Sequence, residues 1–259
     1  MKARFGWMVC VAVIVLMGTV VLAQGKGMDA ALQAKADGGD AQSQYLVGVA
    51  YSQGNGVEAD DAKAVLWFGK AAAQGNAQAE LNLGLMYDKG VGVTQNYAQA
   101  AGWYRKAALQ GVSEAEFNLG SLYERGLGVP QDATQALDLY RRAAGRGNAA
   151  AQFNLALLYD NGTGVEQDYA QAAGWYRKAA EQGLARAQYN LGAMYVSGQG
   201  VAKDYVEAYF WFDIAAGSSA GARQQEATKA RDSVGARLAA ADLAVAKARA
   251  AKWLGERQK

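Results

Sequence analysis

The stretch Asn82-Leu83-Gly84-Leu85-Met86-Tyr87-Asp88-Lys89-Gly90-Val91-Gly92-Val93 decides the fold, because near-copies of it return every 36 residues. Each copy carries a Gly-x-Gly-Val loop, and these loops occupy residues 54–57, 90–93, 126–129, 162–165 and 198–201. A repeat of this length is typical of one helix pair in a stacked α-solenoid. The sequence therefore predicts five repeats over residues 41–220.

Each repeat begins with a helix that contains glycine at an interior position. Ala79, Leu83 and Tyr87 recur at helical spacing. Glycine in a helix costs ~1 kcal/mol relative to alanine, so the interior position needs a packing reason, and we expect another helix to approach closely there. The position is held by Gly48, Gly84, Gly120, Ala156 and Gly192. The first glycine of each loop is expected to end this helix in the left-handed conformation.

A second helix follows the loop. Its N-cap is predicted at Asp60, Asn96, Asp132, Asp168 and Asp204, with capping-box partners at Gln99, Gln135, Gln171 and Glu207. An apolar stripe then recurs at helical spacing, in the first copy Ala64, Trp67, Phe68, Ala71 and Ala72. Because the tryptophans recur at one structural position, we interpret them as core residues rather than as a carbohydrate or cofactor site.

Both ends of the array carry segments that differ from the repeat. A helix is predicted over 28–36, so residues 24–40 form an N-terminal cap, and residues 221–259 are predicted to form one or two C-terminal capping helices. The predicted fold class is an all-α, right-handed solenoid of five helix-turn-helix repeats with a cap at each end.

Residues 1–23 have the pattern of a secretory signal peptide. Lys2 and Arg4 precede an uncharged apolar run over 7–22, which is followed by Ala23. The alternative, an uncleaved anchor, is disfavoured because the run is shorter than the ~20 residues that span a bilayer. We expect an exported protein, periplasmic or secreted, with no membrane span after cleavage.

Cleavage also changes the composition. It removes Cys10, the only cysteine, so the mature chain has no disulfide. Of 26 basic residues it removes Lys2 and Arg4, which leaves 24 against 24 acidic ones. A neutral chain lacks the electrostatic footprint of a nucleic-acid-binding protein, so no nucleic-acid partner is expected.

The residue types present argue against an enzyme. The sequence contains no histidine, which removes Ser-His-Asp and Cys-His mechanisms and ordinary zinc sites. Gly217-Ser218-Ser219-Ala220-Gly221 matches a nucleophile-elbow string, but it lies between predicted helices and has no histidine partner. No serine is followed three residues later by lysine. We expect no catalytic residue, no metal and no cofactor.

A binding surface is predicted on the stripe at positions i, i+4, i+7 and i+11 of each first helix. The side-chain amides of its asparagines can hydrogen-bond an extended peptide backbone as donor and acceptor. Alternatively, each amide can hydrogen-bond a residue of a neighbouring repeat. The sequence is compatible with both interpretations. The candidate partner-binding residues are Gln78, Asn82, Lys89, Glu114, Asn118, Arg125, Asn154, Asn161, Arg186 and Asn190.

The repeat resembles the Sel-one-like repeat (SLR) family. The resemblance rests on Ala77–Tyr87, the loop Gly90-Val91-Gly92-Val93, and Trp103-Tyr104-Arg105-Lys106-Ala107-Ala108 with Gly111. It implies a solenoid related to tetratricopeptide repeats. Members are generally described as adaptors for protein complexes, and many bacterial members are exported. The resemblance therefore implies a bacterial, exported scaffold that binds a protein or peptide on its concave face.

Two alternatives accompany this hypothesis. Some exported members of the family are described as binding or hydrolysing penicillin-like compounds, so a hydrolase or binding protein for cell-wall or penicillin-like small molecules is one. Those members carry a disulfide in each repeat, which a chain without cysteine lacks. The other alternative is a structural or self-associating solenoid.

Overall fold

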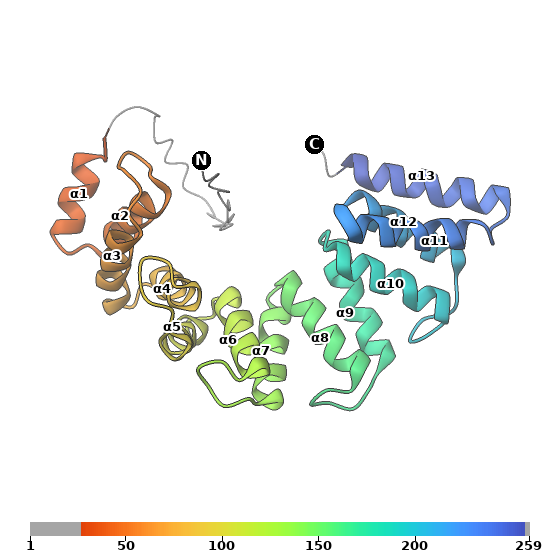
Figure 1. Ribbon diagram of the computed structural model, residues 1–259, viewed down its shortest axis with the longest axis horizontal. Coiled ribbons are helices and arrows are strands. Elements are labelled where there is room, and N and C mark those ends of the chain that lie inside the picture. Colours follow the sequence, from red (N-terminus) through yellow and green to blue (C-terminus); the bar gives the residue numbers. More distant parts are fainter. Residues whose placement is uncertain (1–26, 257–259) are drawn as a thin grey trace, which may run out of the picture.

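The computed structural model describes residues 27–256, which form helices and no strand (Figure 1). The signal peptide predicted over 1–23 lies outside the described residues. The helices are α1 (Ala30–Asp37), α2 (Ala41–Gln53), α3 (Asp61–Ala73), α4 (Ala77–Lys89), α5 (Tyr97–Leu109), α6 (Ser113–Arg125), α7 (Ala133–Gly145), α8 (Ala149–Asn161), α9 (Tyr169–Glu181), α10 (Ala185–Ser197), α11 (Tyr205–Gly217), α12 (Gly221–Gly235) and α13 (Ala240–Glu256).

The helices pack in chain order along an arc. Helices α2 to α11 form five pairs, and each helix contacts the one before it and the one after it. Figure 1 shows α1 and α13 at the two ends of the arc, and in the N-terminal half α2 and α4 lie on its inner side. The prediction of an all-α solenoid of 36-residue repeats is confirmed.

Two glycines shape each loop. The first, such as Gly90, has φ 69° and ends the first helix in the left-handed conformation, as predicted. The second, such as Gly92, also has a positive φ, of 70°, and a Cβ there would collide with the backbone carbonyl of Asp61 at the start of α3. The second glycine therefore lets each loop pack against the preceding repeat.

The second helices are capped as predicted, but the capping box is absent. The Asn96 side chain accepts from Gln99 N at 3.0 Å, and the four aspartates at this position cap in the same way. The N–H of Asn96, however, donates to the carbonyl of Tyr87 at 2.8 Å. The role predicted for the side chains of Gln99, Gln135, Gln171 and Glu207 is therefore wrong, because the first helix of the same repeat already satisfies that N–H.

The tryptophans also depart from the prediction. Phe68 and Tyr104 are buried, whereas the neighbouring Trp67, Trp103 and Trp175 are only partly buried. A lysine one turn on covers each of these indoles, with Nζ of Lys70 at 3.8 Å from the ring centroid of Trp67. Only in the fifth repeat is the tryptophan, Trp211, 5% exposed, where α13 packs on α11.

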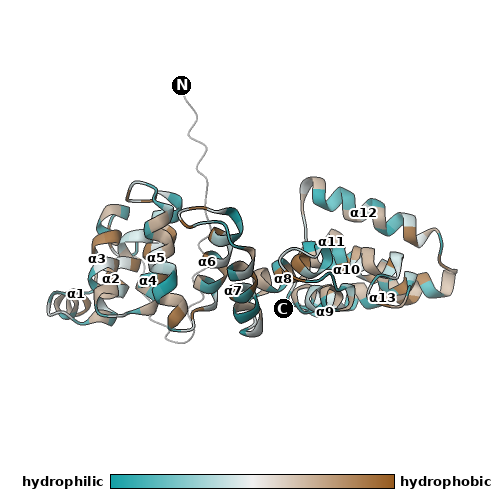
Figure 2. Ribbon diagram, turned by 90° about the horizontal axis from the view of Figure 1, so that it is seen from below, coloured by the Kyte–Doolittle hydropathy of each residue, from teal (hydrophilic) through white to brown (hydrophobic). Residues whose placement is uncertain are grey.

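The segments at the two ends continue the packing of the array. Ala36 in α1 is buried, as are Ala72, Ala108, Ala144, Ala180 and Ala216 at the same offset in the second helices. Helix α12 begins 36 residues after α10, so it follows the register of a sixth first helix. Figure 2 shows hydrophilic and hydrophobic segments alternating along the helices, and between residues 27 and 256 no helix is long and apolar enough to span a membrane.

Candidate binding surface

The predicted stripe lies on the solvent side of the first helices. In α4, Gln78 and Lys89 are exposed and Asn82 and Leu85 are partly buried. The residues between them pack into the core: Ala79, Glu80, Leu81, Leu83, Gly84 and Met86 are buried. The same pattern holds in α6, where Glu114 and Arg125 are exposed and Asn118 is partly buried.

The ends of the stripe differ from its centre. The six candidates at the helix ends are exposed: Gln78, Lys89, Glu114, Arg125, Asn161 and Arg186. The four asparagines at the centre are partly buried: Asn82, Asn118, Asn154 and Asn190. Among the described residues, neither Lys89 nor Arg125 forms an ion pair. Lys89 and Arg125 therefore present unpaired positive charge to solvent.

Three of the central asparagines, among them Asn82 with Tyr45, bond a tyrosine of the preceding repeat. Burial raises the pKa of the Tyr176 hydroxyl, and a hydrogen bond from the Asn190 side chain opposes that rise. Burial likewise raises the pKa of Tyr140, whose hydroxyl meets Asn154. The amides of Asn154 and Asn190 thus link adjacent repeats, which is what the structural interpretation of these asparagines requires.

Tyr140 and Tyr176 also bond a carboxylate within their own repeat. The hydroxyl of Tyr140 donates to Glu124 Oε2 at 2.7 Å, and that of Tyr176 donates to Asp160 Oδ2 at 3.2 Å. Each tyrosine hydroxyl therefore joins both helices of one repeat to the first helix of the next.

Sequence reasoning missed a second polar series near the start of each first helix. Its members are buried, and they are Gln44, Glu80, Glu116, Gln152 and Gln188. In the first repeat, Gln74 Nε2 at the end of α3 donates to Gln44 Oε1 at 2.8 Å and to the carbonyl of Gly39. The signal was present in the sequence, because a polar residue returns every 36 residues, and in four of the five repeats it directly follows a buried alanine.

The third repeat replaces this amide pair with a buried ion pair. Glu116 is fully buried, and its Oε1 accepts from Arg142 Nη2 at 2.7 Å. Arg146 Nε lies 3.4 Å from Glu116 Oε2. Glu116 Oε2 is buried and accepts no hydrogen bond within the described part of the chain, and the pair of Oε1 with Arg142 holds α6 against α7.

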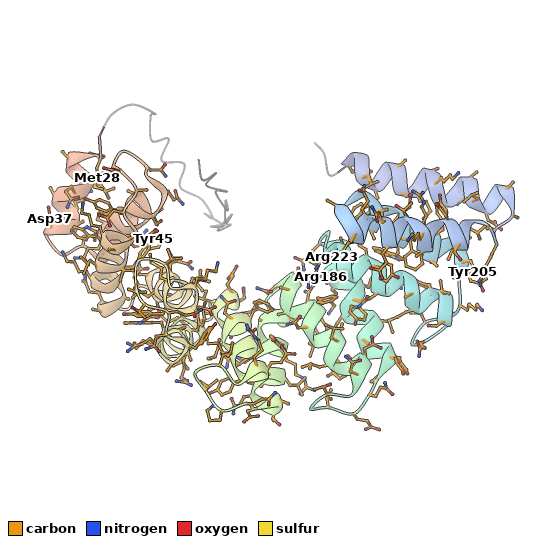
Figure 3. The ribbon with its side chains drawn as sticks, viewed as in Figure 1. Met28, Asp37, Tyr45, Arg186, Tyr205 and Arg223 are labelled. Atoms are coloured by element: carbon orange, nitrogen blue, oxygen red, sulfur yellow. The ribbon has the colours of Figure 1, made fainter. Side chains whose placement is uncertain are left out.

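The structure brings Arg186 and Asn190 together in a small pocket of about 240 Å³. The pocket lies where α10 meets the end of α11 and the start of α12. Figure 3 shows Arg186 and Arg223 beside each other on the inner side of the arc. The pocket is lined by Phe153, Ala185, Arg186, Tyr189, Asn190, Ala215, Ser219, Arg223, Glu226 and Ala227.

A larger pocket of about 600 Å³ lies beside α11 and α13. Arg249 Nη1 pairs with Glu207 Oε1 at 2.7 Å, and Arg177 donates to the hydroxyl of Tyr195. The arginines of this pocket are therefore already engaged by the protein. Among residues 27–256, no group of three or more carboxylate, histidine or cysteine side chains is placed to hold a metal.

The fold and the exposed stripe define a helical-repeat scaffold protein. The Sel1 repeat model matches residues 41–76, 77–112, 113–148, 149–184 and 185–218, so the chain belongs to the Sel1 repeat family. Sel1 repeats generally mediate protein interactions, and proteins of this kind are generally non-catalytic scaffolds.

One solved structure supports this assignment, and a second is similar in sequence. A Sel1 repeat protein from Oxalobacter formigenes is 36% identical with a TM-score of 0.69, and the alignment covers 75% of this chain and 79% of that one. A protective antigen present in uropathogenic Escherichia coli strains, which displays an SLR fold, is 31% identical with a TM-score of 0.45. That alignment covers 86% of this chain and 63% of the antigen. No curated protein matches this chain.

Proposed function

We propose that this chain is an exported scaffold that recognises a protein or peptide along the inner side of its arc. The observation that supports the proposal is the solvent-facing stripe of the first helices. The positions at its ends change from repeat to repeat, from Gln78 to Glu114 and Arg186 at one end and from Lys89 to Arg125 and Asn161 at the other.

The buried face and the exposed ends of each first helix have different roles. The buried face keeps the stack rigid, and a rigid surface binds a partner without the entropic cost of ordering itself. The exposed ends carry different charges in successive repeats, so an extended partner meets a defined series of groups. Complementary charges then select the partner and accelerate its association.

A peptide-display selection tests the proposal. The chain from Gln24 onward contains every described residue and is immobilised against a random-peptide library, after which the dissociation constants of isolated binders are measured by calorimetry. The stripe variant Glu114→Arg/Arg125→Glu is expected to lose at least tenfold in affinity, because it reverses two exposed charges. The control Gln99→Arg/Gln171→Glu introduces the same charges on exposed positions of the second helices and should bind within twofold of the wild type.

Equal binding by the stripe variant and the wild type would overturn the assignment to the first helices. Failure to select any peptide, together with a concentration-dependent increase in mass by light scattering, would favour the self-associating solenoid. Circular dichroism of each variant confirms that the helices are intact.

A further inference from the structure

The pocket around Arg186 exists because the register of the repeats continues beyond the fifth one. Arg186 lies in the first turn of α10, and Arg223 lies in the first turn of α12, which begins 36 residues later. Both side chains line the same pocket of about 240 Å³, and Figure 3 shows them side by side on the inner side of the arc. Earlier repeats have Gln78, Glu114 and Ala150 in place of Arg186, so the pair of arginines is confined to this end.

Neither arginine has a carboxylate partner among the described residues. The guanidinium of Arg186 lies over the ring of Phe153, with Cζ 5.9 Å from the centroid, and Arg223 is exposed. The one acidic side chain that lines the pocket is Glu226. Its carboxylate accepts a hydrogen bond from the hydroxyl of Tyr189. Two guanidinium groups and one carboxylate leave the pocket with an excess of positive charge.

The backbone adds to this positive field. The N-cap residues of α10 and α12 are Leu184 and Ala220, and neither accepts a hydrogen bond through its side chain. Asn76 and Asn148 cap the first helices α4 and α8, whereas α6, whose N-cap is Val112, is uncapped like α10 and α12. A helix N-terminus carries partial positive charge. A cationic side chain beside it makes the local electrostatic potential more positive. Two arginines at two uncapped N-termini thus leave an unmatched site for an anion.

The shape of the pocket limits the anion to a small group. Its volume lies below the ~300–1,000 Å³ typical of sites that enclose a whole small-molecule ligand. Phe153, Ala215 and Ala227 supply apolar wall, which suits the methylene groups that carry a carboxylate. Planar guanidinium groups match the geometry of a carboxylate through paired N–H donors.

We propose that Arg186 and Arg223 bind a carboxylate of the peptide partner in this pocket. The inference rests on the proposed function and specifies the chemistry that one end of the scaffold selects. The carboxylate comes either from an aspartate or glutamate side chain or from the C-terminus of the partner, and the two sources present the same group to the arginines.

Two pentapeptides separate these sources in a titration of the 15N-labelled chain from Gln24 onward. Acetyl-Gly-Gly-Asp-Gly-Gly-amide carries only a side-chain carboxylate, and acetyl-Gly-Gly-Gly-Gly-Ala carries only a free C-terminus. We expect at least one of them to shift the Nε–H signals of Arg186 and Arg223 saturably at low ionic strength. Acetyl-Gly-Gly-Asn-Gly-Gly-amide should leave both signals unchanged, because it is uncharged.

The matched variants are Arg186→Gln/Arg223→Gln and the control Lys229→Gln/Lys247→Gln, which removes two exposed cations of α12 and α13 that lie outside the stripe and the pocket. The pocket variant should weaken the binding of the active peptide about tenfold or more, and the control should bind within twofold. Absence of a saturable shift with both carboxylate peptides, or unchanged binding by the pocket variant, would overturn the inference.

The peptide-display selection distinguishes failure of the carboxylate site from failure of the proposed scaffold function. One outcome is that selected peptides lose affinity for the stripe variant at Glu114 and Arg125 but keep it for the pocket variant. That result supports the scaffold function and refutes the carboxylate site. If no peptide is selected at all, the scaffold function falls, and the titration still reports on the pocket by itself.

Discussion

Gly84 and Tyr104 are in such close contact that a Cβ atom on Gly84 would lie 2.5 Å from Cδ1 of the tyrosine ring. The same relationship joins Gly48 to Phe68, where the separation would be 2.6 Å, and it is looser at Gly120 and Gly192, where the nearest ring atom is 2.9 Å away. In these four repeats the two helices meet at this contact, so it sets how closely they pack.

Gly84→Ala is expected to lower the free energy of unfolding by up to about 2 kcal/mol. Overpacking a core costs roughly 1–3 kcal/mol, and the gain in helix propensity of ~1 kcal/mol offsets part of it. Gly102→Ala is the control, because a Cβ there meets no atom within 4 Å, and it should raise stability. Urea denaturation measures both, and equal effects of the two substitutions would refute the packing argument.

Arg142→Met should destabilise the third repeat by about 1–3 kcal/mol. It leaves the buried carboxylate of Glu116 with Arg146 alone, and breaking a buried pair costs roughly 3–5 kcal/mol before the solvent exposure of Arg142 is considered. Adding Glu116→Gln should recover part of the loss, since Gln44 and Gln152 occupy this position in other repeats. The control Arg125→Met removes an exposed arginine and should change stability by less than about 0.5 kcal/mol.

A double-mutant cycle on Tyr176→Phe and Asn190→Ala distinguishes the two interpretations of the asparagines. If the amide stabilises the stack, the coupling energy should be about 0.5–1.5 kcal/mol. Tyr176→Phe combined with Gln78→Ala, which lies in a different repeat, should be additive. A coupling energy near zero for Tyr176 and Asn190 would contradict the interpretation that the amide stabilises the stack.

Stability should fall steeply above about pH 10, the ordinary pKa of tyrosine. Burial, together with Asp88, raises the pKa of Tyr104, and burial also raises the pKa of Tyr140 and Tyr176. Because the pKa is higher in the folded state, the stability contribution of these hydroxyls is complete below pH 10 and is lost as the pH rises towards the folded values.

The triple variant Tyr104→Phe/Tyr140→Phe/Tyr176→Phe should be less stable at pH 7 and should lose less stability between pH 9 and 11. Thermal melts monitored by circular dichroism at each pH provide the measurement. A wild-type melting curve that is unchanged up to pH 12 would contradict the expected role of the three hydroxyls.

Residues 1–23 are predicted to direct export. Fused to alkaline phosphatase, which becomes active only after export, they should give enzyme activity in bacterial cells. Val13→Arg/Val15→Asp interrupts the apolar run and should abolish that activity, while Lys2→Arg, which keeps the positive charge, should not. Activity that survives the interrupted run would exclude this segment as the signal.

The sequence by itself determined the repeat, its period and the ends of its helices. Gly90 and Asn96 act through their own backbone conformation or through hydrogen bonds to nearby N–H groups, and such local requirements are visible in a linear sequence. The solvent-facing stripe followed from helical periodicity for the same reason. The family assignment rests on this repeated pattern.

Only the tertiary structure decided which groups meet between helices. Trp103 and Tyr104 are adjacent aromatics, yet the tyrosine is buried and the tryptophan is only partly so, because the direction in which each second helix faces its neighbours is set by packing. The bond between Tyr176 and Asn190 and the approach of Arg223 to Arg186 join segments of different repeats. Such contacts depend on the spacing and rotation of stacked helices, which no single repeat encodes by itself.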